Sequence, residues 1–287
     1  MNSLLACVIV NRYPLPINFL EDIPNGPDSL WFDNGQLSAV MTYDNGILHG
    51  KIFEWHENGK RWEGVAREAR AAGLEVWNPA LYAGQTHSEY LHKFAPKQGA
   101  LLGLGLNPGP YGMAQTGIPF TDCRTAQRDL GLALDIPGRA PADLVKRLRK
   151  ETGKWRGTYE RSSLGVYAFL KLAWGTLENA YANWFVGNPC PLLFLEPGGW
   201  NVTPAHPKLK KISGMKELRE EAVERFAGVL KPRGIVCLGQ DVAAAVEEVG
   251  ERLVGKDRYV RYPHPARAVP TKWAEGLVAE LRSRDLL

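Results

Sequence analysis

The sequence predicts an α/β protein: a three-layer α/β/α domain around a mostly parallel sheet, preceded by a small antiparallel β-meander. From residue 62 onward, short apolar runs typical of buried strands alternate with amphipathic helix patterns. In the first sixty residues the turn-forming pair Asn-Gly recurs four times between strand-like runs. We therefore expect a hairpin extension over residues 1–61 and an α/β domain over residues 62–287.

In the N-terminal extension, turn signals recur at intervals that are typical of consecutive β-hairpins. Asparagine and glycine both tolerate the positive φ of a type I′ turn, so each Asn-Gly pair predicts a hairpin. Strand-like runs cover residues 36–43 and 47–55, and the stretch 44–60 resembles a variant MORN-type repeat. The extension is either a small meander packed on the next domain or a docking element for a partner or DNA. The Asn-Gly pairs begin at Asn25, Asn34, Asn45 and Asn58.

The extreme N-terminus predicts a buried strand over residues 4–10 rather than a signal peptide. A signal peptide needs a basic n-region and a longer apolar stretch before its cleavage site. Only three residues precede Leu4, and none of them is basic. We therefore expect the protein in the cytoplasm, associated with the nucleoid.

In the α/β domain the predicted strands define one functional edge. Parallel strands end at the same edge of a sheet, and ligands bind beyond those carboxyl ends. Polar motifs follow three of the predicted strands and are therefore candidate functional sites. The strands are expected at residues 101–106, 234–239 and 259–262, the helices at 61–72, 215–230, 241–254 and 271–284, and a helix end followed by a strand at 180–186.

The composition is typical of a globular protein and argues against a membrane protein. The 287 residues are 45% hydrophobic and 23% charged, which is typical of a globular protein with a substantial core. No stretch reaches the roughly 18 apolar residues of a spanning helix, so no membrane association is expected. Lys and Arg outnumber Asp and Glu by 31 to 24 after residue 62, whereas the first 62 residues have 4 against 7. This excess favours a polyanionic partner for the larger domain, with a merely soluble basic enzyme as the alternative.

The cysteines argue against a metal centre. The four cysteines are Cys7, Cys123, Cys190 and Cys237, and no two form a C-x-x-C pair. The histidines likewise show no metal-ligand spacing. We expect no metal and no cofactor.

The first polar motif is rich in glycine and proline. Gly103, Gly105 and Gly109 miss the spacing of a dinucleotide-binding loop by one residue. Pro108 and Pro110 obstruct a helix at that point, which disfavours a nucleotide-cofactor enzyme. The motif instead predicts a rigid turn whose bare backbone can approach a planar ligand and present N–H groups to it.

The second and third motifs each hold one polar side chain beside proline. Asn188 precedes Pro189, and its amide offers one donor and one acceptor face to a ligand. The alternative is an asparagine that only caps a turn. His264 stands between two prolines, which restrict its orientation, although a structural histidine would satisfy the same pattern.

Taken together, these motifs resemble the single-strand-selective monofunctional uracil-DNA glycosylases, within the uracil-DNA glycosylase superfamily. The resemblance begins with WNPALY at residues 77–82 and continues with GLNPGPYGMAQTGIPF at 105–120. It extends through NPCPLLFLEPGGWNVTP at 188–204 and closes with the His-Pro pair at 264–265. It covers about residues 62–287, and the first long run is the most specific part.

The resemblance implies roles for five residues. It assigns catalysis to Asn107, which would position the attacking water, and to His264, which would steady the departing uracil. It assigns base recognition to Asn188, which would read the uracil edge, to Phe120, which would stack on the base, and to Met113, which would contact the base through its backbone.

Four further residues are expected near the DNA. Gly109 would leave room beside the base, which predicts tolerance of 5-substituted uracils and deaminated purines. Pro110, Arg267 and Lys272 are expected to contact DNA, the last two beside the wedge that follows the His-Pro pair. Only seven residues separate that pair from the next tryptophan, fewer than the family usually has. The shorter wedge favours single strands.

The implied activity is that of a monofunctional DNA glycosylase. It would hydrolyse the N-glycosidic bond of uracil in DNA, leave an abasic site and so initiate base excision repair. No lysine stands in the matching motifs to attack the sugar, so no strand cleavage is expected. We expect a monomer that acts on single- or double-stranded DNA. The alternative is a catalytically weak DNA-damage-binding module of the same fold.

Overall fold

The computed structural model describes residues 58–287, apart from 95, 133, 135–137 and 153–158, together with four strands before residue 49. Several predictions fall outside the described residues: the strand at residues 4–10, Cys7, the Asn34-Gly35 and Asn45-Gly46 pairs, and residues 49–55 of the predicted strand 47–55.

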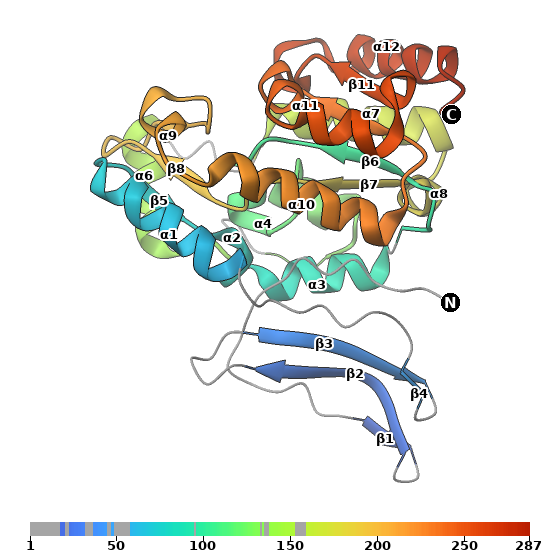
Figure 1. The fold of residues 1–287 in the computed structure, drawn as a ribbon, viewed down its shortest axis with the longest axis horizontal. Helices are drawn as coiled ribbons and strands as arrows, with labels where there is room; N and C mark the ends of the chain where they lie inside the picture. The colour runs from blue at the N-terminus through green and yellow to red at the C-terminus, as the bar shows by residue number, and fades with distance from the viewer. Residues whose placement is uncertain are drawn as a thin grey trace.

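A parallel sheet of four strands forms the centre of the α/β domain (Figure 1). Its order is β11-β10-β6-β7, and each neighbouring pair is parallel. The strands are short apolar runs that are buried almost throughout, as the sequence predicted. Their bounds are β6 (Leu101–Leu104), β7 (Trp184–Gly187), β10 (Ile235–Leu238) and β11 (Tyr259–Tyr262).

Helices cover both faces of this sheet. Trp184 and Phe185 are consecutive in β7, so their side chains point to opposite faces. Trp184 packs edge-on against Phe169 of α7 (Arg161–Trp174), with ring centroids 5.1 Å apart. Phe185 packs against Phe226 of α10 (Met215–Leu230), at 5.8 Å. The predicted three-layer α/β/α arrangement is therefore confirmed.

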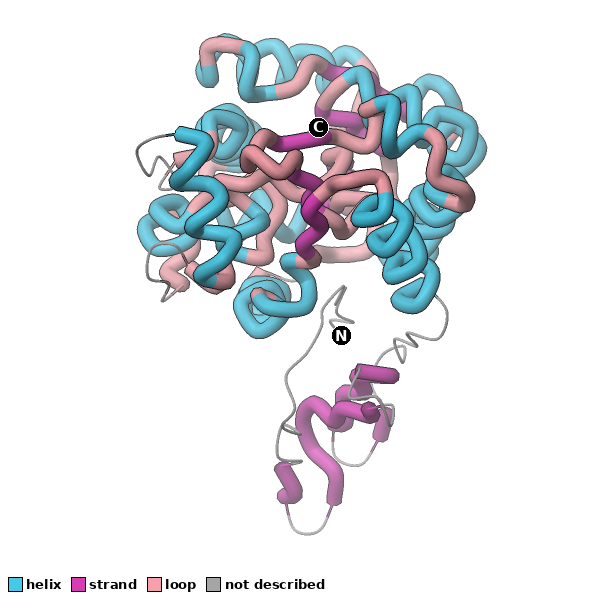
Figure 2. The backbone as a smooth tube through the Cα atoms, turned by 90° about the vertical axis from the view of Figure 1, so that its left-hand side faces the viewer, coloured by secondary structure: helices cyan, strands magenta, loops and turns pink. Residues whose placement is uncertain are grey.

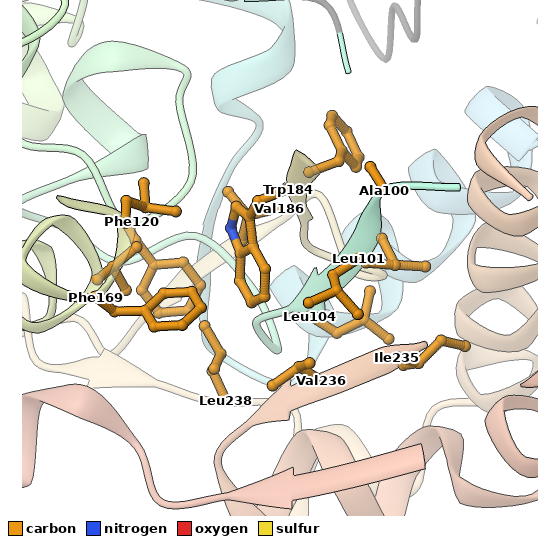
Figure 3. Packing of buried hydrophobic residues seen from close by; sticks show 14 of the residues in the cluster. Ala100, Leu101, Leu104, Phe120, Phe169, Trp184, Val186, Ile235, Val236 and Leu238 are labelled. Atoms are coloured by element: carbon orange, nitrogen blue, oxygen red, sulfur yellow. The ribbon is translucent and has the colours of Figure 1, made fainter. Parts of the chain in front are cut away.

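The buried core explains one of the glycines in the first motif. In Figure 3, Trp184 lies beside β6, among Phe169, Leu104 and Val186. A Cβ on Gly103 would overlap the Trp184 indole. Gly103 therefore serves packing rather than ligand binding.

The remaining elements complete the two outer layers and were only partly foreseen. The predicted helices at 61–72, 215–230, 241–254 and 271–284 are present with small shifts at their ends. These are α1 (Asn58–Ala71), α10, α11 (Gln240–Val254) and α12 (Pro270–Ser283), and the predicted helix end before β7 is α8 (Leu177–Asn183). The helices that were not predicted are α7 and the shorter α2 (Pro79–Tyr82), α3 (Gly84–Lys93), α4 (Met113–Thr116), α5 (Cys123–Arg128), α6 (Ala142–Thr152) and α9 (Pro207–Lys210), with single 3₁₀ turns η1 (Lys256–Arg258) and η2 (Pro265–Arg267).

A small antiparallel sheet accompanies the central one. It has the order β5-β8-β9, formed by β5 (Glu75–Trp77), β8 (Leu193–Leu195) and β9 (Asn201–Val202). Each strand has only two or three residues, too few for a period-two pattern to be visible in the sequence. Within the described part of the chain, no helix is long and apolar enough to cross a bilayer.

The N-terminal strands form a separate antiparallel meander (Figure 2), β1 (Asn18–Leu20), β2 (Ile23–Trp31), β3 (Leu37–Asp44) and β4 (Ile47–Leu48). Asp44 faces Ile47 across β3 and β4, so this hairpin lies where the sequence predicted it. The predicted turn at Asn25-Gly26 is wrong, because β2 pairs Asn25 with Asn18 of β1. The predicted turn at Asn58-Gly59 is also wrong, because these residues begin α1.

Candidate active site

The three polar motifs meet at one edge of the central sheet. Parallel pairing places the carboxyl ends of β6, β7, β10 and β11 together. The Gly105 N–H donates to the Gly187 carbonyl at 3.0 Å, which joins the ends of β6 and β7. The Gly239 N–H donates to the Tyr262 carbonyl at 2.8 Å, which joins the ends of β10 and β11. The predicted convergence of the motifs is therefore present in the fold.

The side-chain amide of Asn188 has one hydrogen-bonded atom and one atom without a partner among the described residues. Its Nδ2 donates to the Met113 sulfur at 3.1 Å. Its Oδ1 is buried and accepts no hydrogen bond from any described residue. A buried acceptor without a donor costs roughly 1–3 kcal/mol. This oxygen is therefore suited to accept a hydrogen bond from a ligand N–H.

Phe120 lies beside that amide because Gly105 has no side chain. A Cβ on Gly105 would overlap the Asn188 Oδ1 and lie 2.8 Å from the Phe120 ring. Phe120 is 8% exposed and has a φ of 54°, which is uncommon for an aromatic residue. Such backbone strain persists where the surroundings enforce it, and it clusters at functional sites. Here it places an aromatic ring next to a hydrogen-bonding amide edge.

His264 approaches the same ring from the end of β11. The ring centroids of His264 and Phe120 are 6.1 Å apart, with a 45° tilt. The backbone N–H of Ala266 donates to His264 Nδ1 at 3.2 Å. In the neutral imidazole the proton must then be on Nε2, which becomes a donor.

The protonation state of His264 follows from its surroundings. Although His264 is exposed at the surface, its ring lies beside Phe120, where desolvation lowers the pKa of the imidazole, and the charge of Arg267 lowers it further. Asp241 acts in the opposite direction. The ring is therefore neutral at physiological pH, with a donor on Nε2.

Asn107 is held at the start of the glycine-rich turn. Its Nδ2 donates to the carbonyl of Leu192 at 3.1 Å and to that of Pro108 at 3.4 Å. These two hydrogen bonds use both N–H groups of the Asn107 amide. The side-chain carbonyl oxygen is left as the group that can accept a hydrogen bond from a water.

We call Asn107, Met113, Phe120, Asn188 and His264 the strand-end cluster. Asn188 donates a hydrogen bond to the Met113 sulfur. The Asn188 Oδ1 and the Phe120 ring both lie next to Gly105. The Phe120 ring in turn lies next to the His264 ring. Asn107 follows Gly105 by two residues on the same turn. The residues that the sequence predicted for catalysis and base recognition thus share one region.

The other predicted site residues lie around the cluster. Pro110 is buried, and its carbonyl accepts from the Gln115 side chain at 3.1 Å. Arg267 and Lys272 are exposed on the segment that follows His264. Trp273 closes this segment, because its indole N–H donates to the Pro263 carbonyl at 2.7 Å.

Gly109 differs from its expected role. A Cβ at Gly109 would point toward Glu160 and lie 3.0 Å from its Oε1. The missing side chain at Gly109 therefore makes room for a carboxyl group of the protein. Glu160 is a residue that the sequence did not single out, because a lone glutamate before an apolar helix has no distinctive pattern.

The basic side chains divide into two groups. Lys208, Lys210 and Lys211 are exposed around the short helix α9. Lys216 instead forms ion pairs with Glu220 and Glu248, both at 3.6 Å. The first group is therefore the better source of positive charge for a polyanion.

Replacement of Gly105 by alanine tests the geometry of the cluster. The added methyl must displace either the Asn188 Oδ1 atom or the Phe120 ring, and both are buried. We expect the reaction rate of the site to fall about 10- to 100-fold, because misplaced recognition groups lose transition-state binding. A single-turnover assay measures this. Gly228→Ala is the control, since a Cβ there meets nothing within 4 Å; equal activity of both variants would contradict the arrangement.

No model of a protein family matches the chain. A mouse protein named single-strand selective monofunctional uracil DNA glycosylase is 32% identical over 213 residues, which are 71% of this chain and 73% of the mouse protein. The bovine protein of the same name is 34% identical over 165 residues, 58% of this chain. The chain spans about three fifths of the bovine protein's length, as the matched share is 60%.

The fold has a solved relative as well. The crystal structure of wild-type Pedobacter heparinus SMUG2 superposes with a TM-score of 0.56 and covers 78% of this chain and 97% of that protein. At 19% identity this likeness supports the fold alone. The sequence match to the mouse protein, over most of both chains, carries the assignment. The chain belongs to the family of single-strand-selective monofunctional uracil-DNA glycosylases.

Proposed function

We propose that this protein is a monofunctional DNA glycosylase that hydrolyses the N-glycosidic bond of uracil in DNA and leaves an abasic site. The observation that carries the proposal is the buried Asn188 Oδ1, which has no donor among the described residues and lies beside the Phe120 ring. A planar base with an N–H on its edge would satisfy both groups at once.

Asn188 would separate uracil from cytosine by hydrogen-bond polarity. Uracil offers a donor at N3 and an acceptor at O4, whereas cytosine offers an acceptor at N3 and a donor at its amino group. The Asn188 carbonyl matches the uracil N3–H, and its amide nitrogen keeps a second hydrogen for O4. Sites that read a polar group in this way discriminate by about 10⁴-fold or more, because the wrong base leaves buried groups unpaired.

Phe120 would support the base from its face. Base–aromatic stacking is worth roughly 1–3 kcal/mol and is tolerant of base identity. Stacking on a buried ring requires the base to leave its own stack, so the substrate is either flipped out of a duplex or taken from a single strand. Affinity and specificity thus come from different residues, Phe120 and Asn188.

Asn107 and His264 would perform the hydrolysis. An amide cannot remove a proton at neutral pH, so Asn107 would hold the water through its carbonyl oxygen rather than act as a strong base. No strong base is required when the bond stretches toward an oxocarbenium-like sugar. The His264 Nε2–H would stabilise the charge that develops on the uracil oxygen, and one such donor is worth roughly 3–4 kcal/mol.

The same chemistry predicts hydrolysis without strand cleavage. None of the five residues in the strand-end cluster is a lysine, so no amine is placed there to form a Schiff base with the sugar. Water would be the nucleophile, and the product would be an intact strand with an abasic site.

The segment after His264 would meet the strand next to the target base. Val269 is 58% exposed there and lies between the exposed cations Arg267 and Lys272. Trp273 ties the end of the segment to Pro263, which keeps it short. A short wedge inserts little side chain into a duplex, so we infer a preference for single strands.

The direct test is incubation with uracil-containing oligonucleotides, single- and double-stranded, followed by alkali. Alkali breaks the strand only where the base is gone, so breaks at uracil and nowhere else support the glycosylase. Intact strands without alkali would confirm that no lyase step occurs. Tight binding without breaks would instead favour the damage-binding module. A matched oligonucleotide with thymine in place of uracil is the control.

The N-terminal meander is expected to be dispensable for the chemistry. Every residue of the strand-end cluster lies between positions 107 and 264, and α1 begins at Asn58. We expect a chain that starts at residue 58 to retain the single-turnover rate of the full protein within about threefold, because the meander contributes no residue to the strand-end cluster. A folded but inactive truncation, checked by circular dichroism, would show that the meander completes the site.

A further inference from the structure

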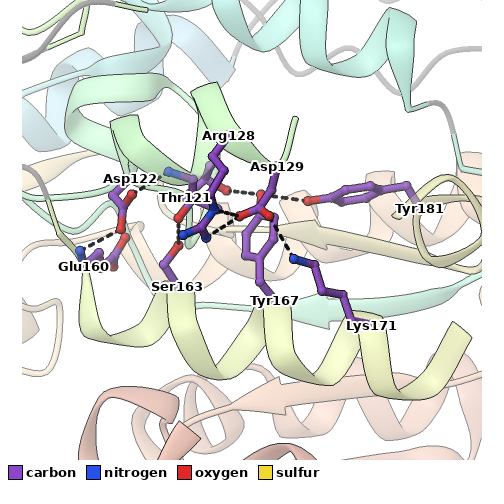
Figure 4. A network of polar contacts seen from close by, with 10 residues as sticks. Thr121, Asp122, Arg128, Asp129, Glu160, Ser163, Tyr167, Lys171 and Tyr181 are labelled. Carbon is purple, nitrogen blue, oxygen red and sulfur yellow. Dashed lines mark hydrogen bonds and ion pairs between the residues drawn. The ribbon is translucent and has the colours of Figure 1, made fainter. Parts of the chain in front are cut away.

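A buried carboxyl outside the strand-end cluster lies against the turn that carries Asn107. Glu160 is the residue just before α7, yet its side chain does not cap the helix. Its Oε1 instead accepts a hydrogen bond from the Ser162 hydroxyl at 2.7 Å. Its backbone N–H donates to Asp122 at 2.9 Å, which fixes the start of α7 to the start of α5 (Figure 4).

Two glycines of the turn make room for this carboxyl. A Cβ on Gly112 would overlap the Glu160 Oε2 and lie 2.5 Å from its carboxyl carbon. A Cβ on Gly109 would lie 3.0 Å from Oε1. Gly112 has a φ of −121°, so a left-handed backbone is not what requires glycine there. The carboxyl is inserted against the backbone between Asn107 and Met113.

The same helix also supports the other catalytic turn. Gly165 lies five residues after Glu160 on α7, and a Cβ there would be 3.1 Å from Pro265 and 3.3 Å from Trp273. Pro265 directly follows His264, and Trp273 ends the segment beyond it. Helix α7 therefore touches the Asn107 turn through Glu160 and the His264 turn through Gly165.

We propose that Glu160 is a positioning residue: its carboxyl sets the place of the turn bearing Asn107 and Met113 relative to His264, with α7 as the rigid connection. The inference rests on the proposed glycosylase function, because it assigns Glu160 to that reaction. Asn107 must hold a water at the sugar carbon that bears the base, on the side opposite the base, while His264 meets an oxygen of the base. A shift of about 1 Å between such groups can cost 10²-fold in rate.

The energetics of the carboxyl are consistent with a role in function. Glu160 Oε2 is buried and has no hydrogen-bond partner among the described side chains and backbone. Burial raises the pKa of Glu160 to about 7, and the nearby Asp122 carboxylate adds to the rise, against the effect of the Ser162 bond. A buried polar atom without a partner calls for an explanation, and a role in placing the adjacent turn supplies one.

Three single variants separate position from charge. We expect Glu160→Ala to lower the single-turnover rate about 10- to 100-fold while the Kd for uncleaved DNA stays unchanged, because the turn loses its support. Glu160→Gln keeps the shape of the side chain and the Ser162 contact, so it should restore most of the rate. Glu178→Ala, an exposed glutamate on α8, is the matched control.

A double variant makes the test independent of folding losses. Gly112→Ala alone should lower the rate, because its methyl overlaps Glu160 Oε2. In the Glu160→Ala background the same methyl enters the space that the carboxyl leaves. We therefore expect the double variant to be faster than Gly112→Ala alone, which is a coupling between contacting residues rather than an additive loss.

The outcomes distinguish this inference from the proposed function. A wild-type protein that releases no uracil overturns the glycosylase, and the role of Glu160 with it. An active wild type overturns only the Glu160 proposal if Glu160→Ala keeps the full rate, or if the losses from Gly112→Ala and Glu160→Ala simply multiply. A Glu160→Ala variant that loses DNA affinity in proportion to rate also contradicts a positioning role.

Discussion

Replacement of Asn107 by alanine is expected to lower the turnover of uracil-containing DNA at least about 100-fold, with little change in DNA affinity. The amide nitrogen of Asn107 is committed to the Leu192 and Pro108 carbonyls, so its carbonyl oxygen has a fixed direction. Alanine removes that oxygen and leaves the water without an acceptor to orient it. Rapid-quench single turnover, with enzyme in excess, measures the chemical step alone.

The Asn107 variant also loses a hydrogen bond, so folding must be checked separately. Loss of the bond to the Leu192 carbonyl costs about 1 kcal/mol of stability. Asn183→Ala is a suitable control, because Asn183 makes a comparable bond to the Asn179 carbonyl at 2.9 Å on α8. If both variants have a similar melting temperature and only Asn107→Ala is slow, the effect belongs to the site. Equal rates in the two variants would remove Asn107 from the mechanism.

The sequence predicted the central sheet and the edge at which the site lies. Runs such as Ile235–Leu238 are short, apolar and bounded by glycine, so burial on both faces is visible without coordinates. The parallel direction of the strands followed from the α/β class, so the polar motifs could be placed at their carboxyl ends. The order of the strands comes from the structure. Asn188 and His264 stood out because each closely follows such a strand. Asn107, Met113 and Phe120 were instead named through the resemblance to a known family.

What the sequence could not show depends on contacts between distant segments. Glu160 and Gly112 are far apart in the chain, and only the fold places that carboxyl against that glycine. The strained backbone of Phe120 is likewise imposed by its surroundings. The prediction of a turn at Asn25-Gly26 was wrong because Asn25 pairs with Asn18 of β1. This pairing outweighs the local preference of Asn-Gly for a turn.

Replacement of His264 by alanine is expected to lower turnover about 100- to 1,000-fold, as the loss of one preorganised donor does elsewhere. The Ala266 N–H occupies Nδ1, so the neutral ring has its proton on Nε2. Desolvation and Arg267 lower the pKa of His264, so the ring stays neutral from pH 7 upward. The rate should therefore change little between pH 7 and pH 8.

Replacement of Arg267 by glutamine removes one of the two effects that lower the pKa of His264. The pKa of His264 should therefore rise, and NMR titration of the imidazole can follow this change.

His206 supplies an internal control for the local structure. It also precedes a proline, and its Nδ1 accepts from the Lys208 N–H at 3.3 Å, the same arrangement as at His264. His206→Ala removes the same turn bond but lies before α9, outside the strand-end cluster. A large loss of rate at His264 alone therefore reports the Nε2 donor rather than the turn, because both variants lose the Nδ1 bond. Comparable losses in the two variants would mean that the His-Pro turn matters only for folding, and the leaving uracil would then need another donor.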